Sequence, residues 1–338
     1  MTQPPLSARV DAPAQLQPAP VEGVIWRSAT MDDLDAVVGL YATMAEVDHP
    51  DWAEQREEVE QEFQLSHVDL ARDTLIGEIE GAMAAFGQVY APAEPETVMR
   101  SILFGGVDPC FRGRGIGRSL LNWQEGRGRQ QLAESGLSMP GWLMSYSQNV
   151  NTGASRLFER AGFATERYFW QLERNLADPI PTLELPAPLR LVNVTSERAE
   201  DIRAAKNAAF RDHWGSQPSP REAWDGWLGM PARRFDLSFL ALDQEEVVGL
   251  VIVEVNEDDW GRQGFTSSYI SLVGVVAAWR RRGVAPALLA ASMTASRDAG
   301  LERTILDVDT ANPSGALGLY TGMGFTHVDG SRAHVKRF

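Results

Sequence analysis

Cysteine and lysine are both scarce in this chain of 338 residues. Cys110 is the only cysteine, which excludes an intrachain disulfide framework and a metal site built from several thiolates. The five histidines show no H-x-H or H-x-x-x-H spacing, so we expect no metal. Of the 31 basic residues only Lys206 and Lys336 are lysines. Contacts with phosphate groups must therefore come mainly from arginine, whose forked guanidinium suits them.

Long apolar runs are also missing. No stretch approaches the roughly 18 consecutive apolar residues of a membrane span, and the first 20 residues have neither the basic start nor the apolar centre of a secretion signal. The net charge is −15 and the pI is about 4.8, so most of the surface repels a nucleic-acid backbone. We expect a cytoplasmic protein that binds neither membranes nor nucleic acid.

What the chain does contain is an internal repeat. GGVDPCFRGRGIGRSLL begins at Gly105, and GVVAAWRRRGVAPALL follows at a spacing of 168 residues between matching positions. A second pair, ASRLFERAGF and ALGLYTGMGF, recurs at a spacing of 162 residues. Two segments that recur in the same order and at nearly the same spacing indicate two copies of one fold.

The repeat and a proline-rich stretch between the copies predict the domain boundaries. We expect a disordered tail over 1–21, a first domain over 22–174, a linker over 175–188 and a second domain over 189–338. The linker contains NLADPIPTLELPAP, whose prolines favour an extended segment. In each copy, strands joined by tight turns lead to a nearly continuous apolar strand and a helix, which indicates strands and helices packed together, with the apolar strand covered on both faces.

A glycine-rich loop opens the predicted helix of each copy. It reads R-G-R-G-I-G from Arg112 and R-R-R-G-V-A from Arg280. Small residues let several backbone N–H groups point at one anion from the start of a helix, where the helix dipole also favours negative charge. The loop lacks both the dinucleotide-binding G-x-G-x-x-G order and the lysine of a P-loop. It therefore predicts a phosphate site of another kind.

This loop resembles the R/Q-x-x-G-x-G/A pyrophosphate loop of the GNAT superfamily, the acyl-CoA-dependent N-acyltransferases, and it occurs twice. The resemblance implies two tandem GNAT folds, each an α/β fold of the α+β type with a mixed sheet. It implies acetyl-CoA as co-substrate, held between the splayed fourth and fifth strands of the sheet. It also implies strand amides that hold the acyl group. The implied cofactor-binding residues are Val107, Arg112, Gly113, Arg114, Gly115, Ile116 and Gly117 in the first copy, and Val273, Val275, Arg280, Arg281, Arg282, Gly283, Val284, Ala285 and Asn312 in the second.

The same resemblance implies an acid catalyst in the second copy only. The family places a tyrosine beside the departing CoA thiolate, and Tyr320 matches that position. A hydroxyl group can protonate or stabilise a thiolate as the C–S bond breaks, whereas phenylalanine cannot. The first copy carries Phe158 at the matching position. We therefore expect catalysis in the second domain and, in the first, binding without turnover, as a regulatory or structural CoA site.

The base that deprotonates the acceptor amine is less clearly marked. Glu254, at the end of VIVEV, is our first candidate, ahead of Glu257, Asp258 and Asp259 in the loop that follows. The tandem architecture resembles the mycothiol synthase family, but the carboxylate that this family carries early in the fourth strand appears here as Tyr269. That departure leaves open whether base and substrate are shared.

The sequence thus predicts an N-acetyltransferase that moves an acetyl group from acetyl-CoA to a primary amine of a small molecule, by direct attack. His213, Trp214, Trp224 and Trp227 lie in the segment that builds the acceptor pocket of this fold. Two alternatives remain at this point: a non-catalytic protein that binds or senses acyl-CoA, and an acetyltransferase like mycothiol synthase.

Overall fold

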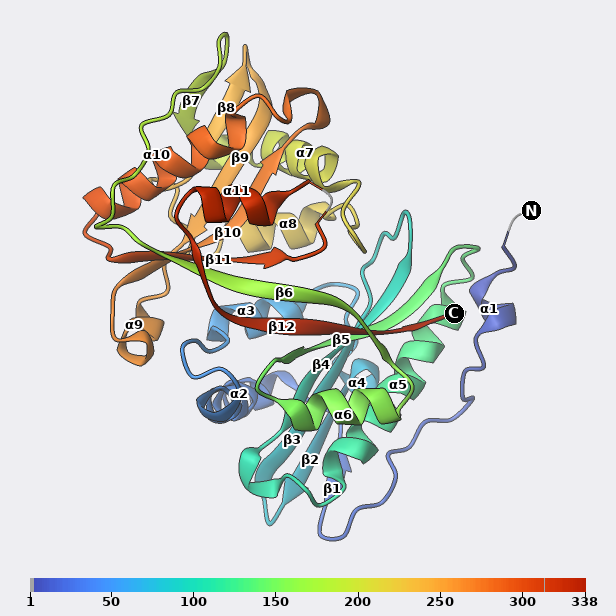
Figure 1. The fold of residues 1–338 in the computed structure, drawn as a ribbon. Coiled ribbons are helices and arrows are strands. Elements are labelled where there is room, and N and C mark those ends of the chain that lie inside the picture. Colours follow the sequence, from blue (N-terminus) through green and yellow to red (C-terminus); the bar gives the residue numbers. More distant parts are fainter. Residues whose placement is uncertain (1–2, 313) are drawn as a thin grey trace. The chain divides into compact units, whose positions relative to one another are not determined.

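The structure is a computed structural model that describes residues 3–312 and 314–338. The chain divides into two compact units, each described separately (Figure 1). Unit 1 comprises Met1–Arg167 and Ser331–Phe338, and unit 2 comprises Tyr168–Gly330. Each unit is a mixed, mostly antiparallel sheet covered by helices, which confirms the predicted fold class.

Within the described part of unit 1, five strands and six α-helices belong wholly to this unit. The strands are β1 (Ile25–Arg27), β2 (Thr74–Ile79), β3 (Ala82–Tyr90), β4 (Met99–Val107) and β5 (Gly141–Gln148), and the helices are α1 (Leu6–Arg9), α2 (Leu34–Asp48), α3 (Arg56–Gln64), α4 (Leu70–Asp73), α5 (Ile116–Glu134) and α6 (Thr152–Arg160). Neighbouring strands pair antiparallel except β4 and β5, which are parallel.

Unit 2 repeats this plan. Its strands are β7 (Arg190–Asn193), β8 (Phe239–Asp243), β9 (Glu246–Glu254), β10 (Ser267–Val275) and β11 (Arg303–Asp309), and its helices are α7 (Ala199–Phe210), α8 (Arg221–Leu228), α9 (Glu257–Gln263), α10 (Val284–Asp298) and α11 (Ala316–Gly322). β10 and β11 form its parallel pair. The hairpin predicted in SFLALDQEEVVGLVIVEV is confirmed as β8 and β9.

The remaining two strands run from one unit into the other. β12 (Thr326–Arg337) pairs antiparallel with β5 through Ser331–Arg337, and β6 (Ala164–Asn175) pairs antiparallel with β11 through Phe169–Asn175. The first half of the sequence thus supplies β6, which lies beside the parallel pair of unit 2. The second half supplies β12, which lies beside the parallel pair of unit 1. The boundaries between the two compact units therefore lie between residues 167 and 168 and between residues 330 and 331. The sequence repeat had instead suggested a boundary in the proline-rich segment.

Strand alternation explains why each sheet is covered on both faces. In unit 2, Val251 and Val253 of β9 face the core formed with α10, while Leu250 and Ile252 face the core formed with α7 and α8. Figure 1 shows α10 and α11 on one side of this sheet and α7 and α8 on the other. A sheet buried on both faces needs the continuous apolar runs found in the sequence.

The N-terminal segment, expected to be a disordered tail, instead lies along α5 in unit 1. Leu6 and Val10 are buried, and the Leu6 N–H donates to the Leu137 carbonyl at 2.8 Å. Farther along, the Ser119 hydroxyl donates to the Ala19 carbonyl at 2.6 Å. Prolines hold this segment extended, and the few apolar residues between them reach the core.

We predict that Leu6→Ala destabilises unit 1 by about 2–5 kcal/mol, because it removes a fully buried side chain. The matched control is Leu183→Ala, whose side chain is exposed and whose loss should change stability by about 0.5 kcal/mol or less. Urea unfolding followed by tryptophan fluorescence measures both. Equal stability of the two variants would show that the N-terminal segment contributes nothing to the core.

Candidate active site

The candidate site of unit 2 begins where its two parallel strands separate. β10 and β11 pair only through Ser267–Tyr269 and Arg303–Ile305, although both strands continue for several residues. The register of β10 against β9 shifts between Ile270 and Leu272, so Ser271 is an extra residue on β10. A bulge of this kind bends the strand and increases its local twist. The result is a wedge between β10 and β11 that opens toward the end of β10.

The backbone of β10 presents hydrogen-bonding groups to this wedge. The Val276 N–H donates to the Val248 carbonyl of β9 at 3.0 Å. Backbone groups alternate in direction along a strand, so the N–H groups of Val275 and Val273 point away from β9, toward the side that β11 has left. These are the two residues whose amides the sequence analysis selected.

Directly after β10, the glycine-rich loop takes the backbone form that an anion site requires. Gly283, which precedes α10, has φ = +84°, and its counterpart Gly115 before α5 has φ = +89°. This left-handed region is easily reached by glycine. The first N–H groups of the following helix have no intrahelical acceptor. At Val284 and Ala285, and at Ile116 and Gly117, they are therefore available to a phosphate.

The arginines of the two loops fall into two groups. The first arginine of each loop is occupied by protein acceptors: Arg112 donates to Asp48 at 2.7 and 2.8 Å and to the Val107 carbonyl, and Arg280 donates to the Val275 and Ala209 carbonyls. These two side chains tie the loop to the preceding strand and to the end of α2 or α7. They fix the shape of the loop.

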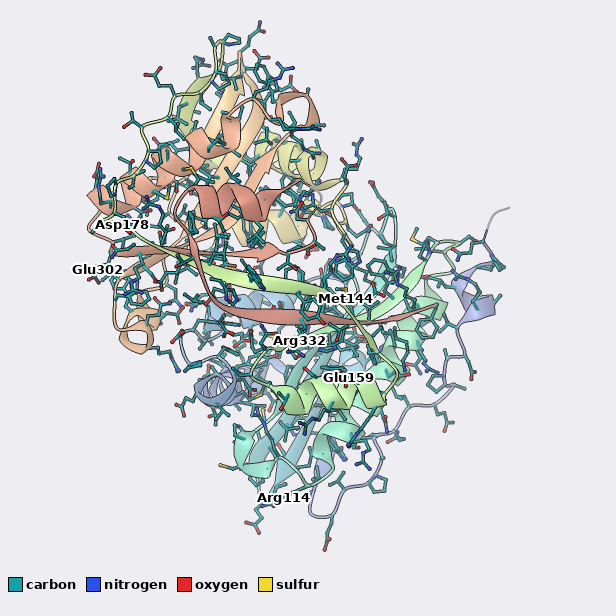
Figure 2. All side chains as sticks on the ribbon, viewed as in Figure 1. Arg114, Met144, Glu159, Asp178, Glu302 and Arg332 are labelled. Atoms are coloured by element: carbon teal, nitrogen blue, oxygen red, sulfur yellow. The ribbon has the colours of Figure 1, made fainter. Side chains whose placement is uncertain are left out.

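The later loop residues are left at the surface. Arg281, with φ = +59°, and Arg282 are exposed in unit 2, as are Gly113 and Arg114 in unit 1. Figure 2 shows Arg114 at the outer turn before α5. Arg282 lies over the Trp279 ring at 4.9 Å. These exposed guanidinium groups, rather than Arg112 and Arg280, can meet a phosphate.

Asn312 lies in the turn between β11 and α11. Its side-chain oxygen accepts a hydrogen bond from the Ser314 N–H at 2.9 Å, and its carbonyl accepts one from Gly315 at 3.2 Å. In this structure Asn312 therefore shapes the turn that starts α11. The helix that follows this turn, α11, carries Tyr320.

Tyr320 is buried on α11, where its ring contacts Phe325 edge-on at 5.9 Å. Burial raises the pKa of Tyr320 to about 12. Its phenol therefore stays protonated at neutral pH and can donate a proton or a hydrogen bond. Tyr320 packs in the core formed with α10, together with Ile270 of β10 and Leu306 and Val308 of β11.

Glu254, the first candidate for the base, has a cationic partner. It forms an ion pair with Arg233, whose side chain is only 2% exposed. The Arg233 guanidinium also lies 4.0 Å from the centre of the Trp227 ring and donates to the Trp227 carbonyl. Glu254 therefore neutralises a buried arginine. Glu257, Asp258 and Asp259 lie in the first turn of α9.

A carboxylate that the sequence analysis missed lies on the next strand. The Tyr269 hydroxyl donates to Asp307 Oδ2 at 2.7 Å, across β10 and β11. Tyr269 also pairs with Glu254 in the register of β10 and β9. The alternation of acidic and apolar residues in ILDVD was the available signal, since it puts Asp307 and Asp309 on one face of β11.

The aromatic residues expected to line an acceptor pocket have different environments. Trp224 is buried in the core, where its indole N–H donates to the Ala199 carbonyl. Trp227 packs on Trp224 and on Arg233. His213 is half-buried beside Phe210, and burial lowers the pKa of its ring. Trp224 is therefore a core residue, whereas His213 stands near the loop arginine Arg280.

The matching region of unit 1 lacks the same chemical groups. Phe158 replaces the tyrosine and stacks on His334 at 4.9 Å. In the register of β3 and β4, Tyr90 pairs with Ile102 as Glu254 pairs with Tyr269 in unit 2. The register of β4 against β3 runs from Ala85 to Tyr90 without a shift, so the bulge of β10 is also absent. Unit 1 thus has the glycine-rich loop but lacks the tyrosine, the acidic residue and the bulge that unit 2 has at the corresponding positions.

Within residues 3–312 and 314–338, no three His, Cys, Asp or Glu side chains gather in a way that could hold a metal ion. In the same residues no helix has the length and apolarity needed to cross a membrane.

Comparison with known proteins matches the two halves separately. Residues 37–163 and 199–325 each match the Acetyltransferase (GNAT) family, and together they make up more than half of the chain. Proteins of this family use acyl-CoA as co-substrate. Both matched segments contain the glycine-rich loop and the helix that carries Phe158 or Tyr320.

Relatives and solved structures agree with this match. A mycothiol acetyltransferase of Thermobispora bispora is 32% identical over 226 residues, which cover 65% of this chain and 70% of the relative. One of Nocardia farcinica is 29% identical over 268 residues, covering 75% and 80%. A GCN5-related N-acetyltransferase from Sphaerobacter thermophilus shares the fold with a TM-score of 0.68 at 24% identity, covering 94% and 96%.

A tandem GNAT protein from the clavulanic acid biosynthesis pathway also shares the fold, with a TM-score of 0.66 at 15% identity over 93% of this chain and 98% of that one. The tandem arrangement is therefore found in a solved relative of the fold. The chain belongs to the Acetyltransferase (GNAT) family, carries two copies of its fold, and is an acyl-CoA-dependent N-acetyltransferase.

Proposed function

We propose that unit 2 transfers an acetyl group from acetyl-CoA to the primary amine of a small molecule. The observation that carries this proposal is the wedge between β10 and β11, because its separated strands leave the amides of β10 without a partner on β11 and it opens toward the loop of α10. Each part corresponds to one portion of the co-substrate. The loop would hold the pyrophosphate, the wedge the thioester, and Tyr320 the sulfur.

The chemistry follows from these positions. The N–H groups of Val273 and Val275 would hold the acyl and pantetheine amide region by hydrogen bonds, which fixes the carbonyl for attack. An unprotonated amine attacks the carbonyl carbon, and the C–S bond then breaks. Tyr320 would give its proton to the departing thiolate. No covalent intermediate with the protein is needed.

For unit 1 we propose acyl-CoA binding or a structural role, without turnover. The specific observation is Phe158, which has no proton to give and stacks on His334. The preserved loop at Gly115 keeps the geometry of a phosphate site. Several relatives are named mycothiol acetyltransferases. The acceptors to test therefore include a mycothiol-related amine, together with amino sugars and diamines.

We predict that Tyr320→Phe lowers kcat by about 10²-fold, because it removes the proton donor, and leaves the Kd for acetyl-CoA unchanged. Thiol release is measured with a disulfide reagent, and binding by calorimetry. The matched control is Tyr41→Phe, which removes one hydroxyl from another buried tyrosine, in unit 1. Undiminished kcat in Tyr320→Phe would rule out the acid role.

The two loops can be compared by paired double variants. We expect Gly283→Val with Ala285→Leu to raise the Kd for acetyl-CoA in unit 2 by about tenfold or more and to abolish turnover, since valine strains a backbone at φ = +84° and leucine fills the phosphate position. Gly115→Val with Gly117→Leu makes the same change in unit 1 and should leave turnover intact.

Calorimetric stoichiometry reports whether unit 1 binds acetyl-CoA, because binding left in the first double variant belongs to unit 1. If the unit 1 variant loses turnover and the unit 2 variant stays active, catalysis takes place in unit 1. If wild-type protein binds no acetyl-CoA, the proposed donor is wrong.

A further inference from the structure

The function proposed for unit 2, on which this inference rests, requires that the acceptor amine lose a proton. A primary amine is protonated near neutral pH and cannot attack a thioester in that form. A carboxylate close to the thioester position must therefore bind the ammonium group and accept a proton from it. The candidates on the strands that flank this position are Glu254 of β9 and Asp307 and Asp309 of β11.

Glu254 and Asp309 both interact with other groups of the protein. Glu254 balances the Arg233 guanidinium, which is almost fully buried and would otherwise be an uncompensated charge. Asp309 accepts a hydrogen bond from the Ala311 N–H at 2.9 Å and so caps the turn after β11. A carboxylate committed to a buried arginine or to a backbone turn is poorly placed to receive a substrate.

Asp307 has the right position on β11. Ile305 is the last residue of β11 that pairs with β10, opposite Tyr269. Asp307 follows two residues later, on the same face of the strand, where the two strands have begun to separate. Its side chain is exposed, and the bond from Tyr269 occupies only one of its two oxygens. The second oxygen remains available to a ligand.

We propose that Asp307 binds the ammonium group of the acceptor and takes its proton, and that Tyr269 is the positioning residue that holds the carboxylate in place. The pair would select primary amines that arrive as cations. Uncharged or anionic acceptors would find no partner for the carboxylate. The acceptor class is therefore a cationic small-molecule amine.

The protonation states fit these roles. The Asp307 carboxylate reaches solvent but is surrounded by protein on its other sides. This partial desolvation is the largest effect on its pKa and raises it, the Tyr269 hydrogen bond opposes the rise, and Asp329 adds to it. Burial and the adjacent Asp307 both raise the pKa of Tyr269 well above its ordinary value. Tyr269 therefore remains a hydrogen-bond donor, while Asp307 is a better proton acceptor than an ordinary aspartate.

The proton balance is complete with these groups. Asp307 takes one proton from the ammonium group, and the free amine attacks the carbonyl carbon to form the C–N bond. The nitrogen then loses a second proton to solvent as the C–S bond breaks, and the thiolate receives a proton from Tyr320. Solvent reprotonates Tyr320, and Asp307 releases its proton. One proton is produced for each amide formed.

The test uses the full chain with acetyl-CoA and two acceptors, glucosamine and 1,5-diaminopentane. Asp307→Asn should lower kcat by about 10²-fold and raise the KM for the amine, with an unchanged Kd for acetyl-CoA. Added sodium formate should restore part of the activity of Asp307→Ala, because a small carboxylate can enter the space of the lost one. Asp298→Asn, an exposed aspartate at the end of α10, is the matched control.

Tyr269→Phe separates positioning from an independent structural role. It should lower kcat by about tenfold, and adding it to Asp307→Asn should cause no further loss, because Tyr269 acts through Asp307. Additive losses would mean that Tyr269 acts independently. Thermal melting of each variant verifies that the protein is folded.

The outcomes separate this inference from the proposed function. If wild type acetylates either amine and Asp307→Asn keeps wild-type kcat and KM, Asp307 has no such role and the proposed function stands. If Glu254→Gln instead loses turnover while remaining folded, Glu254 is the base. If wild type binds acetyl-CoA and turns over with neither amine, nor with any other primary amine, both proposals fail.

Discussion

The site depends on a single interruption of the hydrogen-bond ladder between β10 and β11. In a continuous parallel pair, each strand satisfies the inner N–H and C=O groups of the other. Here pairing stops after Tyr269 and Ile305, and a bulge at Ser271 turns β10 aside. Backbone groups that lose a partner need another one. An extended ligand with amide groups can supply it, which makes the pantetheine arm of CoA chemically suited to this gap.

The surrounding elements keep the wedge open. Gly274 lies so close to α7 that an added Cβ would come within 3.0 Å of Phe210 and 3.2 Å of Ala209. Arg280 then ties the following loop to the end of the same helix through the Ala209 carbonyl. The strand, the loop and α7 are thereby fixed to one another. A rigid support of this kind holds the reacting groups without help from the ligand.

The sequence predicted the features that a backbone conformation or a repeat imposes. Gly115 and Gly283 stand out because both copies need the same left-handed turn before a helix. The sequence did not predict contacts between distant residues. Arg233 and Glu254 are 21 positions apart, and Tyr269 and Asp307 are 38 apart, and nothing in their local patterns joins them. The exchange of β6 and β12 between the units could not be predicted either. The alternation of buried and exposed residues along a strand does not identify the strand with which it pairs.

The charges around the wedge also distinguish its two substrates. The protein carries a net charge of −15, which opposes the approach of the phosphates of CoA. At the end of β10 this is offset locally by Arg281, Arg282 and the start of α10, where backbone N–H groups also favour an anion. Farther back, at the point of separation, the exposed charge is the carboxylate of Asp307. Under the proposed function, an anionic donor and a cationic acceptor would be attracted to different ends of the wedge, so that the thioester and the amine would meet between them.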